Sequence, residues 1–224
     1  MCGRFTLHHD AQEIAERFGA ESLPELEPRY NIAPTQGVTV VTQNGSRHLA
    51  QYHWGLIPAW AKDRTIGSRM INARAETLAE KPAFRTALQR RRCLIPADGF
   101  YEWREADNPE EGGRTPMYIH RRDGALFAFA GLWEEWHDPA TQTPLRSCTI
   151  ITGSPNPIIA PVHDRMPMIL NREDEGRWLD HAVKDAPTLL SLLAPYPAEE
   201  IEVYPVSRRV NAPVVDDPDL IRPV

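Results

Sequence analysis

The sequence has little cysteine, no long apolar run and no metal-binding spacing, and each absence narrows what the protein is. Cys2, Cys93 and Cys148 are odd in number and widely spaced, which argues against a disulfide framework and suits a reducing compartment. No apolar run approaches the roughly 20 residues that a membrane-spanning helix needs. Neither a Cys-x-x-Cys nor a His-x-x-x-His pair occurs, so we expect no metal site and no cofactor.

Export signals and a strong positive charge are also missing. The chain does not open with a cationic segment, an apolar stretch and a small-residue cleavage site, so we expect a cytoplasmic protein with no membrane association. A formal net charge of −6 argues against a protein that coats nucleic acid along its whole surface. A local basic groove remains compatible with that charge.

The amino-acid composition is that of a globular protein. A chain of 224 residues fits one large domain or two small ones, and we expect a single domain over residues 1–224, present as a monomer. The 21 prolines are spread along the chain, which disfavours long helices. The acidic segment 105–113 (EADNPEEGG) is interpreted as a mobile hairpin tip.

Strand-like and helix-like segments define the expected fold class. Two hairpins are expected, 37–42 with 48–54 around Asn44-Gly45, and 117–121 with 125–133 around Asp123-Gly124. Further strands are expected at 147–152, 166–170 and 200–206, and helices at 11–18, 81–89, 172–181 and 186–193, the third capped by Asn171. Because hairpins outnumber helices, we predict an α+β domain with a curved, mostly antiparallel, barrel-like sheet and peripheral helices.

Cys2 is the first residue with unusual chemistry. A small residue after the initiator methionine usually lets Met1 be removed, which leaves Cys2 with a free α-amine beside its thiol. With pKa values of about 7.7–8.0 and about 8.5, both groups are usable nucleophiles near neutral pH. The amine forms a Schiff base with an aldehyde and the thiol closes a thiazolidine ring, or the amine serves as base for the thiol, as in N-terminal nucleophile hydrolases. On position alone, an ordinary N-terminal residue is the favoured interpretation.

Seven motifs, in order along the chain, favour a chemical role for Cys2 over that interpretation. They lie at 2–5 (CGRF), 29–34 (RYNIAP), 54–60 (WGLIPAW), 71–77 (INARAET), 93–103 (CLIPADGFYEW), 163–167 (HDRMP) and 205–211 (PVSRRVN). With these motifs the chain resembles the SRAP family, named for SOS-response-associated peptidase, whose bacterial and animal members process abasic sites in DNA. The resemblance implies one SRAP-like domain, a part in the response to DNA damage, and a catalytic set at Cys2, Asn72, Glu102 and His163.

Three of these side chains have both a catalytic interpretation and a structural one. Glu102 lies between two aromatic residues, where burial would raise its pKa toward the working range, although a lone Glu on a strand is more often a surface carboxylate. His163 exchanges protons near neutral pH and would help open an abasic deoxyribose, although a lone His in a loop is more often structural. Asn72 would position the Cys2 amine or the sugar oxygens, or would simply end a strand.

DNA binding requires cations for phosphates and flat surfaces for bases. The phosphate candidates are Arg4, Arg74 and Arg85, and the candidates for contacts with bases are Pro34, Trp60 and Trp103. A buried core position is the competing interpretation of Trp60. The run at 90–92 (RRR) is interpreted as a solvated face at a helix end, and Cys93 and Cys148 as inert core residues.

The leading hypothesis is that mature Cys2 forms a covalent thiazolidine crosslink with an abasic site in single-stranded DNA and so shields the lesion. An unpaired lesion is preferred because it exposes its sugar without the cost of unstacking a duplex. Strand cleavage through the Schiff base and reversal of the crosslink with help from Glu102 are related activities. The alternatives are a cysteine-type peptidase with an N-terminal nucleophile and a non-covalent reader of modified bases.

Overall fold

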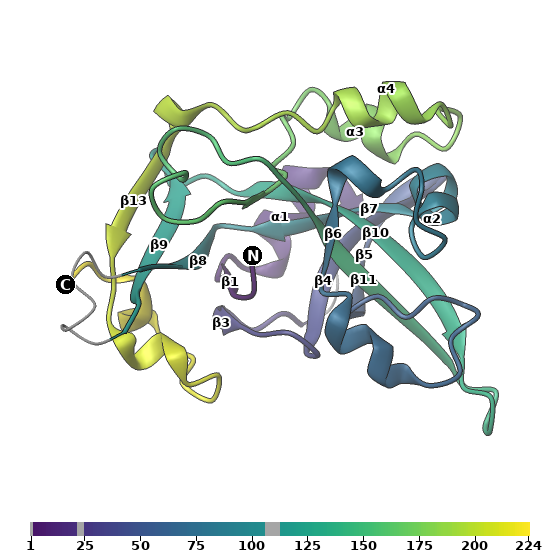
Figure 1. Ribbon diagram of the computed structural model, residues 1–224, viewed down its shortest axis with the longest axis horizontal. Helices are drawn as coiled ribbons and strands as arrows, with labels where there is room; N and C mark the ends of the chain where they lie inside the picture. The colour runs from purple at the N-terminus through teal and green to yellow at the C-terminus, as the bar shows by residue number, and fades with distance from the viewer. Residues whose placement is uncertain (1, 22–24, 106–112) are drawn as a thin grey trace.

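A computed structural model describes residues 2–21, 25–105 and 113–224. Five strands in it close into a barrel (Figure 1). Each pairs with its neighbour in the order β4, β5, β11, β10, β7 and back to β4, and the ring is closed by parallel pairing of β5 with β11. Their bounds are β4 (Gly37–Asn44), β5 (Ser46–Trp54), β7 (Arg92–Ala97), β10 (Phe127–His137) and β11 (Pro144–Gly153).

A second sheet of five strands shares its core with the barrel. Its strands, in sheet order, are β13 (Ile201–Pro205), β9 (Thr115–Arg121), β8 (Gly99–Arg104), β1 (Phe5–Leu7) and β3 (Arg29–Ile32), and every pairing is antiparallel. Phe5 of β1 packs its ring edge against Trp54 and Phe129 of the barrel at 5.2 and 5.8 Å between ring centroids. Such aromatic contacts join the two sheets into one domain.

Short elements complete the fold. β2 (Ala20–Glu21) lies beside β5, and β6 (Asn72–Arg74) and β12 (Met166–Pro167) lie beside β11. The α-helices are α1 (Ala11–Phe18), α2 (Arg85–Arg90), α3 (Glu175–Leu179) and α4 (Ala186–Ser191). The 3-10 helices are η1 (Arg64–Arg69), η2 (Ala75–Thr77), η4 (Ala198–Glu200), η5 (Arg208–Asn211) and η6 (Pro218–Ile221). None of the helices in the described ranges has the length and apolar character needed to span a lipid bilayer.

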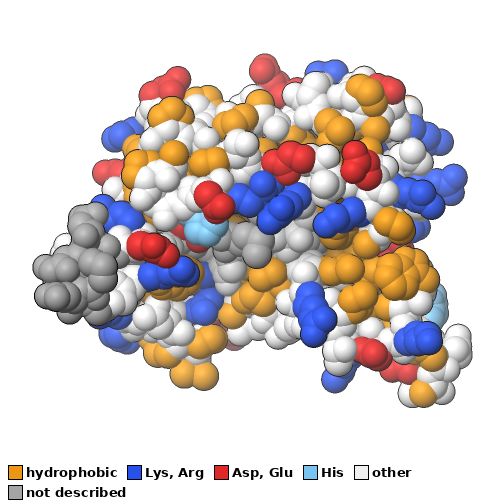
Figure 2. Space-filling model, in the orientation of Figure 1, with side chains coloured by type: hydrophobic (Ala, Val, Ile, Leu, Met, Phe, Trp, Pro, Cys, Tyr) orange, Lys and Arg blue, Asp and Glu red, His pale blue; other side chains and the backbone are white. Residues whose placement is uncertain are grey.

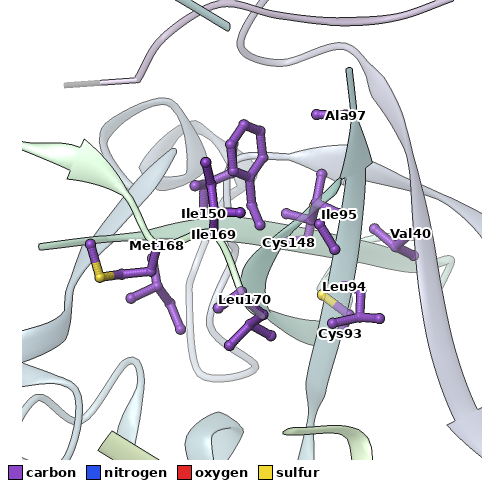
Figure 3. Close-up of a cluster of buried hydrophobic side chains, with 14 of the residues drawn as sticks. Val40, Cys93, Leu94, Ile95, Ala97, Cys148, Ile150, Met168, Ile169 and Leu170 are labelled. Carbon is purple, nitrogen blue, oxygen red and sulfur yellow. The ribbon is translucent and has the colours of Figure 1, made fainter. Parts of the chain in front are cut away.

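The core fills the barrel and the space beside it. Figure 3 shows Val40 of β4, Ile95 of β7 and Ile150 of β11 among its buried side chains, together with the segment that follows β12. Cys93 and Cys148 lie in this cluster and are fully buried, as predicted. β10 is buried along all of its first six residues, because one of its faces packs inside the barrel and the other is covered.

The predicted fold class is confirmed, and the first predicted hairpin is present as β4 and β5. The second hairpin is wrong, because β9 pairs with β8 and β13 whereas β10 pairs with β7 and β11, in the other sheet. Part of the acidic segment 105–113 lies outside the described residues.

Two local predictions also need correction. The third helix starts at Glu175 with Asp174 as its N-cap rather than Asn171. Arg92 does not belong to a solvated face, because it is fully buried and its guanidinium donates to the backbone carbonyls of Leu88, Trp178 and Asp180. A buried Arg with three carbonyl acceptors ties β7 to the helices that cover it.

Candidate functional site around Cys2

Cys2 lies three residues before the start of β1 and is fully buried. β1 is hydrogen-bonded between β3 and β8, so sheet pairing fixes the start of the chain near the middle of the molecule (Figure 1). The side-chain amide of Asn72, the first residue of β6, donates to the backbone carbonyl of Cys2 at 2.8 Å. Two of the four predicted catalytic residues are thus in direct contact, and Asn72 begins its strand rather than ending one.

Glu102 lies on β8, the strand beside β1, and only 2% of it is exposed. Burial raises the pKa of the Glu102 carboxyl, and the neighbouring His163 partly offsets that rise. The expectation of a buried carboxyl with a raised pKa is confirmed, and the surface interpretation is wrong. Because the charge of Glu102 in turn raises the pKa of the Cys2 thiol, the carboxyl lies within electrostatic reach of both Cys2 and His163.

The Cys2 thiol is not the partly ionised group that its ordinary pKa suggests. Burial raises the pKa of this thiol far above its usual value, and the negative charge of Glu102 raises it further. The Sγ atom lies 4.0 Å from the backbone carbonyl oxygen of Arg4, to which the thiol donates. In this environment the thiol is protonated at neutral pH, and it needs a base before it reacts as a nucleophile.

His163 is held by the two residues that follow it. The backbone N–H of Arg165 donates to its Nδ1 at 3.0 Å, and Nδ1 also lies 2.8 Å from a carboxylate oxygen of Asp164. In the neutral ring, acceptance at Nδ1 places the proton on Nε2, whereas in the charged ring Nδ1 donates to Asp164. Both protonation states of His163 therefore have a partner at Nδ1.

Arg165 fixes the loop that carries His163. Its guanidinium forms a two-bond ion pair with Glu76, at 3.2 and 2.9 Å, and donates to the backbone carbonyl of Thr152 at 2.6 Å. This contact joins the loop to η2 and β11, the elements next to β6. The sequence does not predict the pairing of Arg165 with Glu76, because 89 residues separate the two.

A groove of about 460 Å³ opens beside His163. Its walls come from the end of β8, the residue before β9 and the turn that carries His163, and they include Trp103, Arg104, Arg114 and Asp164. Arg104 and Arg114 were not among the predicted residues. The alternation of side chains along a strand would have pointed to Arg104, because it lies two positions after Glu102 on β8.

Arg4 is part of the framework of this site. Its Nη1 donates to Asn31 Oδ1 and to the carbonyl of Val210, both at 2.7 Å, and its guanidinium lies 5.9 Å from the ring centroid of Trp103. Burial lowers the pKa of Arg4. Asn31, which the sequence did not single out, is fully buried on β3 and connects β3 to both Arg4 and the C-terminal segment.

The remaining predicted residues lie farther along the surface. Arg74 is exposed at the end of β6, two residues after Asn72, and Arg85 is exposed at the start of α2, which packs on β7, β10 and α4. Pro34 is half-buried before β4. Trp60 is 61% exposed, so the interpretation of a core tryptophan is wrong.

The segment that carries Trp60 is anchored by close backbone packing. Gly55 has φ +134°, and a Cβ on it would lie 2.6 Å from the carbonyl oxygen of Gly67 in η1. A pocket of about 410 Å³ lies beside Trp60, lined also by Lys62 and Arg69.

Figure 2 shows Lys and Arg side chains gathered on the face that carries the N-terminus, close to an exposed hydrophobic patch.

A family model supplies the decisive comparison, since the one described as SOS response associated peptidase (SRAP) matches residues 1–213. The chain belongs to the SRAP family. Among curated proteins, it is 50% identical over 225 residues to the Bacillus subtilis (strain 168) protein named abasic site processing protein YoqW, covering 99% of both chains. It is 28% identical over 268 residues to the Gallus gallus protein named abasic site processing protein HMCES, covering 100% of this chain and 78% of the relative.

Two solved structures share the fold. A crystal structure of a Bacteroides thetaiotaomicron protein superimposes with a TM-score of 0.90 at 27% sequence identity, covering 100% of both chains. A Bordetella bronchiseptica protein gives a TM-score of 0.77 at 26% identity, covering 92% of this chain and 100% of that one. The arrangement of barrel and second sheet is therefore common to this chain and both proteins.

Proposed function

We propose that this protein processes abasic sites in single-stranded DNA, and that mature Cys2 forms a thiazolidine crosslink with the aldehyde of the opened sugar. The observation that carries the proposal is that Cys2, Asn72, Glu102 and His163 come from four separate segments and are linked by a hydrogen bond and by electrostatic interactions, with His163 at the wall of a groove. Relatives at 50% and 28% identity that are named abasic site processing proteins support the same substrate.

The chemistry balances without an external reagent. After Met1 is removed, the Cys2 amine adds to C1′ of the ring-opened deoxyribose, and the carbinolamine loses one water to give a Schiff base. The thiol then adds to the imine carbon, and its proton ends on the ring nitrogen. One amine, one thiol and one aldehyde give one thiazolidine and one water, with no change in oxidation state.

The order of the two bonds follows from the environment of Cys2. Burial keeps the thiol protonated, so the amine attacks first and the thiol adds only when a base takes its proton. Glu102 suits both steps, because its raised pKa lets the acid assist the departure of water and the resulting carboxylate accept the thiol proton. In the reverse reaction, the same carboxyl would assist reversal of the crosslink.

His163 and Asn72 have supporting roles. In its charged form, with Nδ1 donating to Asp164, His163 donates the Nε2 proton to the sugar-ring oxygen while the C1′ hydroxyl gives a proton to water, which opens the deoxyribose to its aldehyde. The Asn72 amide donates to the Cys2 carbonyl at 2.8 Å. This bond orients the amine and the thiol of Cys2 toward the same carbon of the sugar, C1′. Strand cleavage by β-elimination from the Schiff base would compete with ring closure at this site.

DNA reaches the site across a cationic surface. Arg74 at the end of β6 and Arg104 in the groove are placed for phosphates, and Trp103 and Trp60 for bases. Because Cys2 is buried, the sugar has to leave the base stack to reach it, and this costs least in single-stranded DNA. A local surface of this kind is compatible with the net charge of −6.

The test starts with mature protein, confirmed by intact mass, and single-stranded DNA with one abasic site. We expect a heat-stable adduct on a denaturing gel for the unaltered protein and none for Cys2→Ala. Cys2→Ser keeps the amine and loses the thiol, so we expect an adduct from it only after borohydride reduction of the Schiff base. Cys148→Ser, a change at a buried cysteine in the barrel, is the matched control and crosslinks as the unaltered protein does.

Two outcomes would overturn the proposal. Equal heat-stable crosslinking by Cys2→Ser without a reductant would exclude the thiazolidine. Cys2-dependent peptide cleavage with no DNA adduct would favour the peptidase, whose nucleophile attacks a peptide carbonyl instead of an aldehyde.

A further inference from the structure

A second polar cluster lies at the far end of β1 from Cys2. His8 and His9 follow directly after this strand, and Asp98 lies in the corner between β7 and β8. Pairing of β1 with β8 brings them together, and the backbone N–H of Asp98 donates to the carbonyl of Thr6 at 3.1 Å. This cluster is independent of the crosslinking site.

The Asp98 carboxylate is buried and oriented by the protein. Its Oδ2 accepts from the backbone N–H of His8 at 2.6 Å, and its Oδ1 accepts from the Thr6 hydroxyl. Within the described ranges, its ion-pair partners are His8 and His9. A cation bound between a buried carboxylate and two imidazoles would stabilise that carboxylate.

The two imidazoles are ordered yet reachable from solvent. The His8 ring stacks between His9 and Tyr30, with ring centroids at 5.2 and 5.1 Å and interplanar angles of 14° and 15°. The side chains of His8 and His9 are 28% and 24% exposed. Stacking fixes the direction of the ring nitrogens, and the exposure gives an ion an entry path and leaves room for a water ligand.

The spacing of the donor atoms fits a small transition-metal ion. His8 Nε2 lies 3.5 Å from Asp98 Oδ1, and His9 Nδ1 lies 3.2 Å from Asp98 Oδ2. All three donor groups lie within 4.8 Å of one another. Two ligand atoms bound to tetrahedral Zn²⁺ at about 2.1 Å each are about 3.4 Å apart, so binding needs only small side-chain rotations.

We propose that His8, His9 and Asp98 form a site for one Zn²⁺ ion, with water completing the coordination. Two imidazoles and one carboxylate favour zinc over magnesium and calcium, which prefer oxygen ligands. The hydrogen bonds from Thr6 and His8 to Asp98 are the outer contacts that orient a metal-bound carboxylate. The ion would tie the end of β1 to the corner before β8, and so stabilise the strand that carries Cys2.

The test is a calorimetric titration of the full-length protein with Zn²⁺ alone. All proteins carry Cys2→Ser, because a free N-terminal aminothiol is itself a zinc ligand. We expect one ion per chain and a higher Tm with zinc. In His8→Ala and in His9→Ala the affinity falls by at least about 10-fold, and the rise in Tm is lost. His137→Ala, at a half-exposed histidine near the end of β10, is the control and binds as the parent does.

The result that would overturn the site is zinc affinity that is unchanged in both His8→Ala and His9→Ala, with each variant shown to be folded by circular dichroism. Absence of one-to-one binding in the parent would overturn it as well. Neither outcome depends on DNA, so failure here is distinguishable from failure of the crosslinking proposal.

Discussion

Single residues explain why an otherwise ordinary cysteine is a candidate nucleophile. Glu102 interacts electrostatically with Cys2 and with His163, and Asn72 donates to the carbonyl of Cys2. The motifs predicted which residues belong together. They did not predict the protonated thiol, because a pKa depends on burial by distant segments, which the local sequence does not contain.

Glu102→Gln tests the acid and base role at this scale. The amide keeps the shape of the side chain and removes its titration, so we expect adduct formation to slow by about 10²-fold or more. The measurement is the initial rate of adduct formation on a denaturing gel. Glu173→Gln, at an exposed residue before α3, should leave the rate unchanged. A rate within twofold of the unaltered protein in Glu102→Gln would remove Glu102 from the mechanism.

The same substitution predicts a pH-dependent change in stability. Because burial raises the pKa of Glu102 in the folded state, the folded protein binds more protons than the unfolded chain between the two pKa values. Stability is therefore lost as pH rises through that interval. Glu102→Gln should raise the Tm at neutral pH, and the difference should vanish below the pKa of an unfolded Glu. A difference in Tm that does not change with pH would contradict the raised pKa.

At the scale of elements, pairing between strands positions the site. β1 lies between β3 and β8, so the start of the chain, Glu102 and Asn31 are held in one sheet. Sequence patterns predicted α1 with the observed bounds, and they predicted β4, β5, β9, β10, β11, β12 and β13 with bounds that differ by up to four residues at an end. They did not predict β1 or β3, and they paired β9 with β10. A turn signal at Asp123-Gly124 shows where the chain bends, but the partner of each strand is set by long-range packing that the local pattern does not encode.

Asn31→Ala tests the contact that joins β3 to the end of the chain. Asn31 is buried, and its amide donates to the carbonyls of Val210, Ala212 and Val215. Loss of these bonds, and of the bond that Asn31 Oδ1 accepts from Arg4, should cost about 1–3 kcal/mol of stability, or ~2–4 °C in Tm per kcal/mol. Thermal unfolding is the measurement.

The exposed Asn171 gives the matched control for Asn31. Asn171→Ala should change the free energy of unfolding by less than about 0.5 kcal/mol. Equal stability of Asn31→Ala and Asn171→Ala would show that the bonds of Asn31 do not hold the C-terminal segment.

Across the whole molecule, the face around the N-terminus carries Lys and Arg side chains interspersed with Asp and Glu side chains, beside an exposed hydrophobic patch (Figure 2). The charge balance of the sequence predicted only that any basic surface would be local. The cluster at His8, His9 and Asp98 was missed because the search for metal ligands used local spacing, whereas the pairing of β1 with β8 joins residues 90 positions apart.

Trp60→Ala tests the DNA path at this scale. If bases stack on this exposed ring, its loss should weaken binding of single-stranded DNA by about 1–3 kcal/mol, roughly fivefold or more in Kd. Fluorescence anisotropy with unmodified DNA measures this without the covalent step. Val214→Ala, at another exposed hydrophobic residue, is the control. Equal Kd values for the two variants would place the DNA elsewhere.

The central claim is that Cys2 reacts through its amine and its thiol together, and the mass of the product tests it most directly. Mature protein and protein that retains Met1 are each mixed with single-stranded DNA carrying one abasic site. The mature protein should give one product whose mass is the sum of protein and DNA minus one water. The Met1-retaining protein, with the same cysteine, should give none. An adduct of equal yield from the Met1-retaining protein would contradict the account.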